Sequence, residues 1–137
     1  MPTWQEWREM AESSLVDARI LLERGQHRGA VSRAYYAAYQ MVTAVLIKLG
    51  TTLPAGRNNW DHDTTQVLYW YAISNRRTSK RSQLMGLRIA FNDLLQMRTT
   101  ADYRPHLEVS MEKTRTLVTK ASSLWNVLNE LIDNNEV

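Results

Sequence analysis

The segment LLQMRTTADYRPH, residues 94–106, passes directly from leucines to a group of ionisable side chains. Arg98 and Asp102 are four residues apart, so on a helix they share a face and can form an ion pair. Tyr103 follows five residues after Arg98, about 140° round the same helix, and His106 comes after a proline. Two interpretations are open. The group either caps and tethers a helix end, or forms a site where Arg98 faces a phosphate or a partner carboxylate.

A second arginine lies in the tyrosine- and alanine-rich segment SRAYYAAYQM, residues 32–41. Tyr35, Tyr36 and Tyr39 stand among small residues that let another helix approach closely, which is typical of core packing with satisfied hydroxyls. Arg33 stands beside this apolar face. It must therefore either extend to solvent or pair with a carboxylate.

The segment RRTSKR, residues 76–81, holds four cations. Such a segment can contact phosphates, although a solvated loop is the commoner interpretation. With the arginines of the other two segments, it completes the set of candidate nucleic-acid-binding residues, which is Arg33, Arg76, Arg77, Lys80, Arg81 and Arg104.

Asp61, His62 and Asp63 are consecutive and raise the question of a metal site. Adjacent side chains point in different directions, and no Glu-x-x-His or His-x-x-x-His pair occurs, so no metal is expected. Helix capping explains the two aspartates better, while His62 can still line a cleft. The sequence also has no glycine-rich phosphate cradle and no nucleophile elbow, and we expect no cofactor.

Apolar periodicity predicts five amphipathic helices and no strand. The first carries a stripe from Trp4 to Leu22, begins with a Thr3–Glu6 capping box and stops at Gly25. The others are a helix of about 27–49 ended by Gly50, a helix opened by an Asp63–Gln66 capping box, a helix carrying Leu84 to Leu95 up to the opening segment, and a helix with a stripe from Met111 to Ile132. The short 24–28 connection makes the first two helices antiparallel neighbours. We therefore predict an all-α, up-down bundle of four to five helices.

Composition sets the remaining limits. The 137 residues predict a single domain, residues 1–137, that is large enough for a core without covalent links. There is no cysteine, which excludes disulfides and thiolate metal sites. No apolar run approaches the roughly 20 residues of a membrane span, and the acidic, amphipathic N-terminus differs from a secretory signal; a cytoplasmic protein is expected. The net charge of +3 permits contact with nucleic acid without requiring it.

Three segments together resemble the HEPN superfamily: GAVSRAYYAAYQMVTAVLIKLG at 29–50, NWDHDTTQVLYW at 59–70, and the stretch 94–121 that contains RTTADY. The likeness is to its small prokaryotic branch with Arg-Ala-Tyr-Tyr-Ala and Arg-x-x-Ala-Asp-Tyr segments. It implies a helical bundle that is commonly a homodimer. Many HEPN proteins are metal-independent RNases of toxin–antitoxin, abortive-infection or CRISPR systems, and a frequent partner is a minimal nucleotidyltransferase, which serves as the antitoxin.

The resemblance also implies a catalytic signature, Arg-x(4–6)-His, from which this sequence departs. Arg98 matches the arginine, but the fifth following position holds Tyr103, and His106 lies eight residues on. Metal-free RNA cleavage needs a base, an acid and a cation. The catalytic candidates are therefore Arg98, Asp102, Tyr103 and His106. The expected function is a toxin–antitoxin or defence protein, with RNase activity left open. The alternatives are a non-catalytic module that binds RNA or nucleotides, and a dimeric structural partner.

Overall fold

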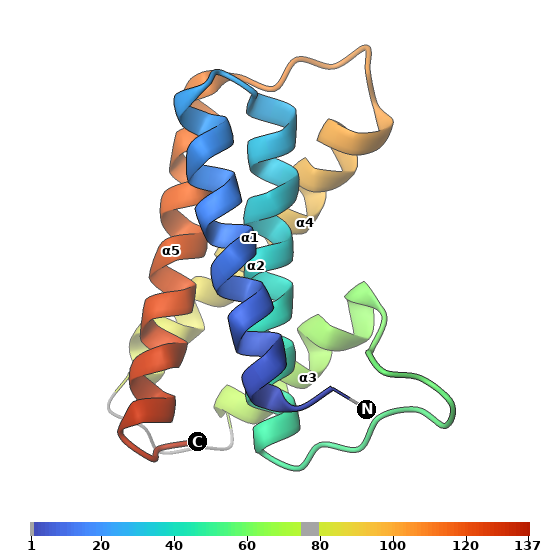
Figure 1. Cartoon of the computed structure of the whole chain (residues 1–137), viewed down its shortest axis with the longest axis vertical. Helices are drawn as coiled ribbons and strands as arrows, with labels where there is room; N and C mark the ends of the chain where they lie inside the picture. Colours follow the sequence, from blue (N-terminus) through green and yellow to red (C-terminus); the bar gives the residue numbers. More distant parts are fainter. Residues whose placement is uncertain (1, 75–79) are drawn as a thin grey trace.

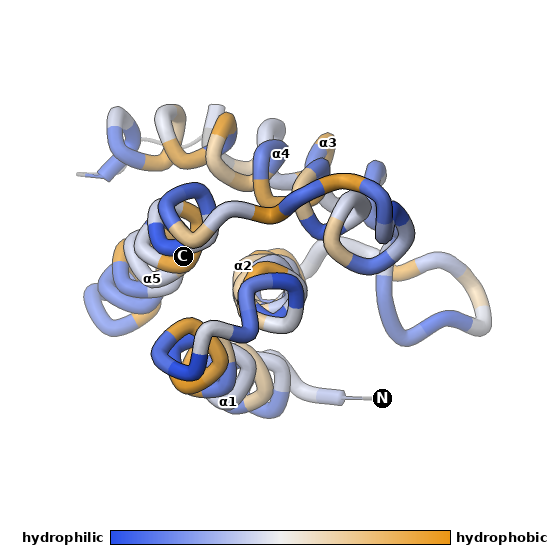
Figure 2. The backbone as a smooth tube through the Cα atoms, turned by 90° about the horizontal axis from the view of Figure 1, so that it is seen from above, coloured by the Kyte–Doolittle hydropathy of each residue, from blue (hydrophilic) through white to orange (hydrophobic). Residues whose placement is uncertain are grey.

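The computed structural model describes residues 2–74 and 80–137. Five helices follow one another along this part of the chain: α1 (Trp4–Glu23), α2 (His27–Lys48), α3 (His62–Ser74), α4 (Arg81–Tyr103) and α5 (Met111–Asp133). No β-strand occurs in the described residues, and the prediction of an all-α bundle is confirmed. Figures 1 and 2 show α2 in the middle, with α1 and α5 on one side and the α3–α4 pair on the other.

The α1–α2 hairpin forms as its local sequence predicts. Thr3 Oγ1 accepts a hydrogen bond from the Glu6 backbone, and the Glu6 carboxylate accepts one from the Thr3 backbone, which completes the capping box. Gly25 adopts a φ of +73° in the turn, a left-handed conformation that glycine adopts without steric cost. The chain therefore reverses within a few residues, and α2 runs back along α1 (Figure 1).

The central position of α2 follows from its small residues. Five of its alanines are buried, namely Ala30, Ala34, Ala37, Ala38 and Ala44, and they let neighbouring helices come close. The α1–α2 interface also contains a buried polar pair, a 2.7 Å hydrogen bond between Ser14 Oγ and the side-chain amide of Gln40. Other helices cover α2 on several sides. A side chain that extends from α2 toward α3 and α4 is therefore largely shielded from solvent.

The cap of α3 differs from the sequence prediction. The carboxylate that accepts from the first turn belongs to Asp61, which receives the Thr64 backbone N–H at 2.7 Å, and the predicted Asp63 cap is wrong. The helix begins two residues earlier than that cap implied, at His62. A capping residue must stand just before the helix, where its oxygen can reach the free N–H groups. The earlier start makes His62 part of α3.

The core follows the predicted apolar stripes with one exception. The largest fully buried side chains come from α2, α4 and α5, and include Tyr35, Met41, Phe91, Leu94, Leu117 and Leu128. Met111 was predicted to join the stripe of α5, but it is half exposed. It is the first residue of α5, and apolar periodicity does not reveal where along a helix the packing begins. Within the described residues, no helix is both long and apolar enough to cross a bilayer.

Candidate functional site

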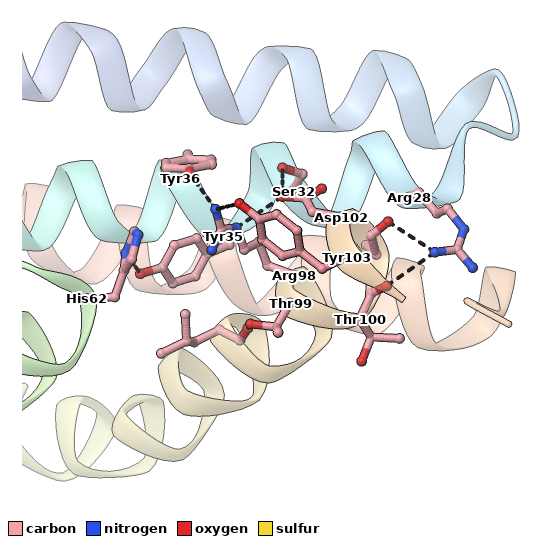
Figure 3. A network of polar contacts seen from close by, with 12 residues as sticks. Arg28, Ser32, Tyr35, Tyr36, His62, Arg98, Thr99, Thr100, Asp102 and Tyr103 are labelled. Atoms are coloured by element: carbon pink, nitrogen blue, oxygen red, sulfur yellow. Dashed lines mark hydrogen bonds and ion pairs between the residues drawn. The ribbon is translucent and has the colours of Figure 1, made fainter. Parts of the chain in front are cut away.

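The site is built around Arg98, in the last two turns of α4. Its Nε donates to Asp102 Oδ2 at 3.0 Å, and its Nη2 donates to the Tyr36 hydroxyl of α2 at 2.9 Å (Figure 3). A longer contact of 3.5 Å joins Nη2 to the Tyr103 hydroxyl. The Arg98 side chain is only 12% exposed. The ion pair that the four-residue spacing predicted is present, and α2 holds it from the other side.

Aromatic rings enclose the Arg98 guanidinium. Its Cζ lies 5.9 Å from the ring centroid of Tyr35, 5.4 Å from that of Tyr36 and 5.3 Å from that of Tyr103, distances at which the ring faces attract a cation. Burial acts to lower the pKa of Arg98, but Tyr36, Tyr103 and Asp102 outweigh it and raise the pKa. The Arg98 guanidinium therefore keeps its positive charge.

Asp102 also receives a hydrogen bond from α2. Ser32 Oγ donates to the same oxygen, Oδ2, at 3.2 Å, so one carboxylate oxygen accepts from two helices. This arrangement fixes the plane of the Arg98 guanidinium. The hydrogen bonds of the Arg98 guanidinium use Nε and Nη2, and within residues 2–74 and 80–137 its Nη1 has no hydrogen-bond partner.

His62 joins the cluster from a third helix. Its Nδ1 lies 2.5 Å from the Tyr35 hydroxyl, and its ring packs against Tyr35 and Tyr36 with centroid separations of 5.3 Å and 6.3 Å. Arg98 contacts the same two rings (Figure 3). Burial and then the Arg98 charge lower the pKa of His62. Sequence reasoning treated His62 only as a cleft residue, because its contact with Tyr35 spans 27 positions and no spacing rule reaches that far.

The segment before α3 is held against α2, and this holds His62 in turn. The Tyr39 hydroxyl donates to the Trp60 carbonyl at 2.5 Å, and Asn59 Nδ2 donates to the same hydroxyl at 3.0 Å. The Tyr39 ring centroid lies 5.1 Å from that of His62. All three tyrosines of α2 therefore bind a polar partner, as the core-packing interpretation expected, but two of those partners belong to the candidate site.

Arg28 is a second arginine at the α2–α4 contact, and sequence reasoning missed it. Its Nη1 donates to the carbonyls of Thr100, Ala101 and Arg104 at 3.2, 3.0 and 3.3 Å. Its Nη2 reaches the carbonyls of Pro105 and Leu107. Cations are favourable at a helix C-terminus because the last carbonyls lack intrahelical partners. Arg28 therefore tethers the end of α4 and the loop that follows it.

Three other predicted residues lie near the Arg98 end of α4. Arg33 lies over Tyr36, with its Cζ 4.8 Å from the ring centroid, and in the described part of the chain it pairs with no carboxylate. His106 is exposed in the loop after α4, where it forms no hydrogen bond or ion pair with any described residue. Arg104 is exposed at the helix end. The structure therefore brings Arg33 to the cluster, while His106 makes no contact with it.

The two described residues of the basic segment, Lys80 and Arg81, lie far from Arg98. Lys80 forms an ion pair with Glu130 of α5 at 3.0 Å, and Arg81 Nη2 donates to the Ser74 carbonyl at 3.2 Å. Arg81 begins α4, so at 1.5 Å per residue it stands about 25 Å along the helix from Arg98. Arg76 and Arg77 lie outside the described residues.

An open hollow of about 390 Å³ lies between α3 and α4, and its lining includes Asp63, Trp70, Tyr71 and Arg88. The Arg88 guanidinium stacks over Trp70, with its Cζ 4.2 Å from the ring centroid. Asp63, next to His62 in the sequence, belongs to this lining. The hollow therefore offers a further cation–aromatic pair, Arg88 and Trp70, that sequence reasoning did not single out.

Comparison with known proteins agrees with this helical arrangement. A family model described as the HEPN domain matches residues 4–131. The chain belongs to the HEPN family. A curated relative, the UPF0332 protein of Thermotoga maritima, is 27% identical over 127 residues, which cover 93% of this chain and 89% of that protein. The HEPN match includes Arg98, Asp102, Tyr36 and His62, so the whole cluster lies in the family's domain, and the resemblance inferred from the sequence is confirmed.

Proposed function

We propose that this HEPN protein acts in a prokaryotic toxin–antitoxin or defence system and contacts RNA through the Arg98 site. The observation that carries the proposal is that the Arg98 guanidinium has a fixed orientation and an unused donor. Asp102 and Tyr36 hold it in one orientation, yet its Nη1 has no partner among the described residues. A fixed guanidinium with free donors is suited to a phosphate group, which arginine binds in a planar fork.

A second cation strengthens this proposal. Arg33 and Arg98 approach the same Tyr36 ring, with Cζ-to-centroid distances of 4.8 and 5.4 Å. Two like charges that share one ring repel each other, and a bound phosphodiester would relieve the repulsion. Exposed aromatic rings beside such cations also provide stacking surfaces for unpaired bases, and Tyr103 is 66% exposed here. The ligand class that fits is single-stranded RNA, and the reaction class is metal-independent RNA cleavage.

The same proposal includes a second subunit, either another copy of this chain or a nucleotidyltransferase-like antitoxin. The α3–α4 face exposes Val67 at 53%, Tyr71 at 60% and Ile89 at 67%, and exposed apolar surface tends to be buried between subunits. Light scattering at tens of micromolar should give a dimer or a heteromeric complex. A monomer with no protein co-purifying would count against this part of the proposal.

A non-catalytic structural role is the second candidate. The observation that favours it is the low exposure of the Arg98 side chain, 12%, together with its three contacts inside the protein. On this view the cluster joins α2 to α4, and the protein serves as a dimeric docking partner. Breaking the cluster would then lower stability without a separate functional loss.

The deciding experiment compares the wild type with Arg98→Ala in a bacterial host and in vitro. Growth, cellular RNA integrity, affinity for a labelled single-stranded RNA and thermal melting are measured together. Arg24→Ala is the control, because Arg24 is exposed in the α1–α2 turn. We expect Arg98→Ala to reduce RNA affinity about tenfold, the loss of one charged contact, and to relieve any toxicity while melting cooperatively. If function falls only in proportion to folded protein, the structural role is correct.

A further inference from the structure

We infer that His62 of α3, and not a residue of α4, is the acid–base group of the Arg98 site. The inference rests on the proposed RNA-directed function, and names the group that would move the proton. Its first observation is that His62 and Arg98 lie near the same two tyrosine rings. The His62 ring lies 5.3 Å from Tyr35 and 6.3 Å from Tyr36 between centroids, and the Arg98 Cζ lies 5.9 and 5.4 Å from the same centroids. The Arg98 guanidinium of α4 and the His62 imidazole of α3 therefore lie near the same two tyrosine rings of α2 (Figure 3).

The groups on α4 and its following loop are less suited to the task. Asp102 Oδ2 already accepts from Arg98 Nε and from Ser32 Oγ, and a carboxylate fixed in this way holds the guanidinium in place. The Tyr103 hydroxyl is itself a 3.5 Å partner of Arg98. His106 forms no hydrogen bond or ion pair within the described residues. Of the two histidines considered, only His62 contacts the rings that surround Arg98.

The surroundings of His62 keep its imidazole neutral. Burial lowers its pKa most, and the Arg98 charge lowers it further, while the flanking Asp61 and Asp63 act in the opposite direction. The groups facing it from α2 are the aromatic rings of Tyr35, Tyr36 and Tyr39. An imidazole that stays unprotonated at neutral pH is ready to accept a proton.

Tyr35 is a partner that suits both protonation states of His62. Its side chain is fully buried, and burial raises the pKa of its hydroxyl, so the hydroxyl keeps its proton. A hydroxyl oxygen can accept from Nδ1–H, and Nδ1 carries a hydrogen both in the imidazolium and in the neutral tautomer whose Nε2 is free to take a proton. The 2.5 Å contact therefore survives when the imidazole gains a proton. Nε2 has no partner in the described part of the chain and is the nitrogen left for substrate.

The reaction that this arrangement would serve balances without a metal. His62 Nε2 takes the proton of an RNA 2′-hydroxyl, and the 2′ oxygen attacks the adjacent phosphorus. The bond from phosphorus to the 5′ oxygen breaks, and that oxygen receives the proton back from the imidazolium. The products are a 2′,3′-cyclic phosphate and a 5′-hydroxyl. Arg98 Nη1 would stabilise the charge that develops on the non-bridging oxygens.

The test measures binding and cleavage of a labelled single-stranded RNA by the purified full-length protein in the presence of a chelator. His62→Gln is compared with wild type, with His106→Gln and with the control His27→Gln. We expect His62→Gln to slow cleavage about 10²- to 10⁴-fold, the usual contribution of a general acid–base group, with RNA affinity changed less than about threefold. The other two variants should cleave like wild type. A strand with 2′-deoxy sugars should bind and stay intact.

The pH–rate profile of the wild type tests the same inference without a variant, in case His62→Gln does not fold. Cleavage should rise with pH through a pKa below the ordinary histidine value of about 6.5, and a flat profile between about pH 5 and 7 overturns the inference. Cleavage that is lost in His106→Gln, or retained in His62→Gln, also overturns it. RNA binding without cleavage by wild type overturns this inference but leaves the proposed RNA contact standing; absence of RNA binding contradicts the proposed function itself.

Discussion

Arg28 and Arg98 both cross the contact between α2 and α4, but their partners are of different kinds. Arg28 starts from α2 and donates to five backbone carbonyls at the end of α4 and in the following loop. Arg98 starts from α4, and within the described residues it donates hydrogen bonds only to side chains, those of Asp102, Tyr36 and Tyr103. One arginine therefore completes a helix end, and the other is held as part of a polar cluster.

This difference indicates that the two arginines at the end of α4 have different roles, a structural one for Arg28 and a functional one for Arg98. Backbone carbonyls at a C-terminus need partners in every folded molecule, so Arg28 meets a structural requirement whatever the protein does. The Arg98 end of α4 does not need a cation for that purpose, because Arg28 already supplies it. The cost of holding Arg98 at 12% exposure among three tyrosine rings therefore calls for another reason, and RNA contact is the reason proposed above.

The largest effect on stability should come from Arg28→Ala. It leaves several carbonyls of the α4 terminus without a partner, and we expect the free energy of unfolding to fall by about 2 kcal/mol, a value reduced for partial exposure from the usual range for charged hydrogen bonds. Denaturant unfolding measures this directly. Arg24→Ala, four positions earlier, should stay within about 0.5 kcal/mol of wild type. Equal losses in the two variants would mean that the carbonyl contacts contribute little.

Replacing Arg98 with lysine should have the opposite effect to Arg28→Ala, since it should reduce RNA affinity with little loss of stability. Lysine keeps the charge but loses the planar fork. Its single ammonium group cannot hold Asp102 and Tyr36 and also donate to a phosphate. We expect RNA affinity to fall about threefold, less than in Arg98→Ala, while the free energy of unfolding changes by roughly 1 kcal/mol or less. Fluorescence anisotropy and denaturant unfolding of the same preparation give both numbers. RNA affinity equal to wild type would show that the site responds to charge alone.

A smaller effect concerns pH. The pKa of His62 is lowered in the folded protein by burial and by Arg98, so the unfolded chain binds a proton at a higher pH than the native state does. Stability therefore falls as pH decreases below the unfolded value of about 6.5. Thermal melts between about pH 5 and 7 should show a shallower decline in His62→Gln than in wild type, while Arg28→Ala keeps the wild-type slope. Parallel declines in wild type and His62→Gln would contradict this assignment.

The smallest effect should come from Tyr103→Phe. Its hydroxyl lies 3.5 Å from Arg98 Nη2 and the residue is 66% exposed, so its loss should cost less than about 0.5 kcal/mol of stability. Tyr36→Phe is the matched comparison, because the Tyr36 hydroxyl lies 2.9 Å from the same nitrogen in a partly buried place. We expect about 1 kcal/mol for Tyr36→Phe. The reverse order in thermal melts would place the main anchor of Arg98 at Tyr103.

Prediction from the sequence succeeded where the interaction was local. The Thr3–Glu6 capping box and the Arg98–Asp102 pair join residues three and four positions apart, which helix geometry brings together by itself. The α3 cap shows the limit of this reasoning, because both Asp61 and Asp63 stand at a plausible helix start. The choice of Asp61 accompanies the docking of the preceding segment through Tyr39, Trp60 and Asn59.

What the sequence determined by itself is a set of five helices, their apolar faces and a pair of charges on one turn of α4. These features follow from hydrogen bonds and spacings within a few residues. They therefore do not depend on how the helices pack against one another. Only the tertiary structure decided which cations meet which partners. Arg28 reaches carbonyls 72 to 79 positions away, and Tyr35 reaches His62 across 27. Such contacts depend on how α3 and α4 pack against α2. The apolar periodicity of a single helix shows which face is buried, but it does not show which residues of another helix that face meets.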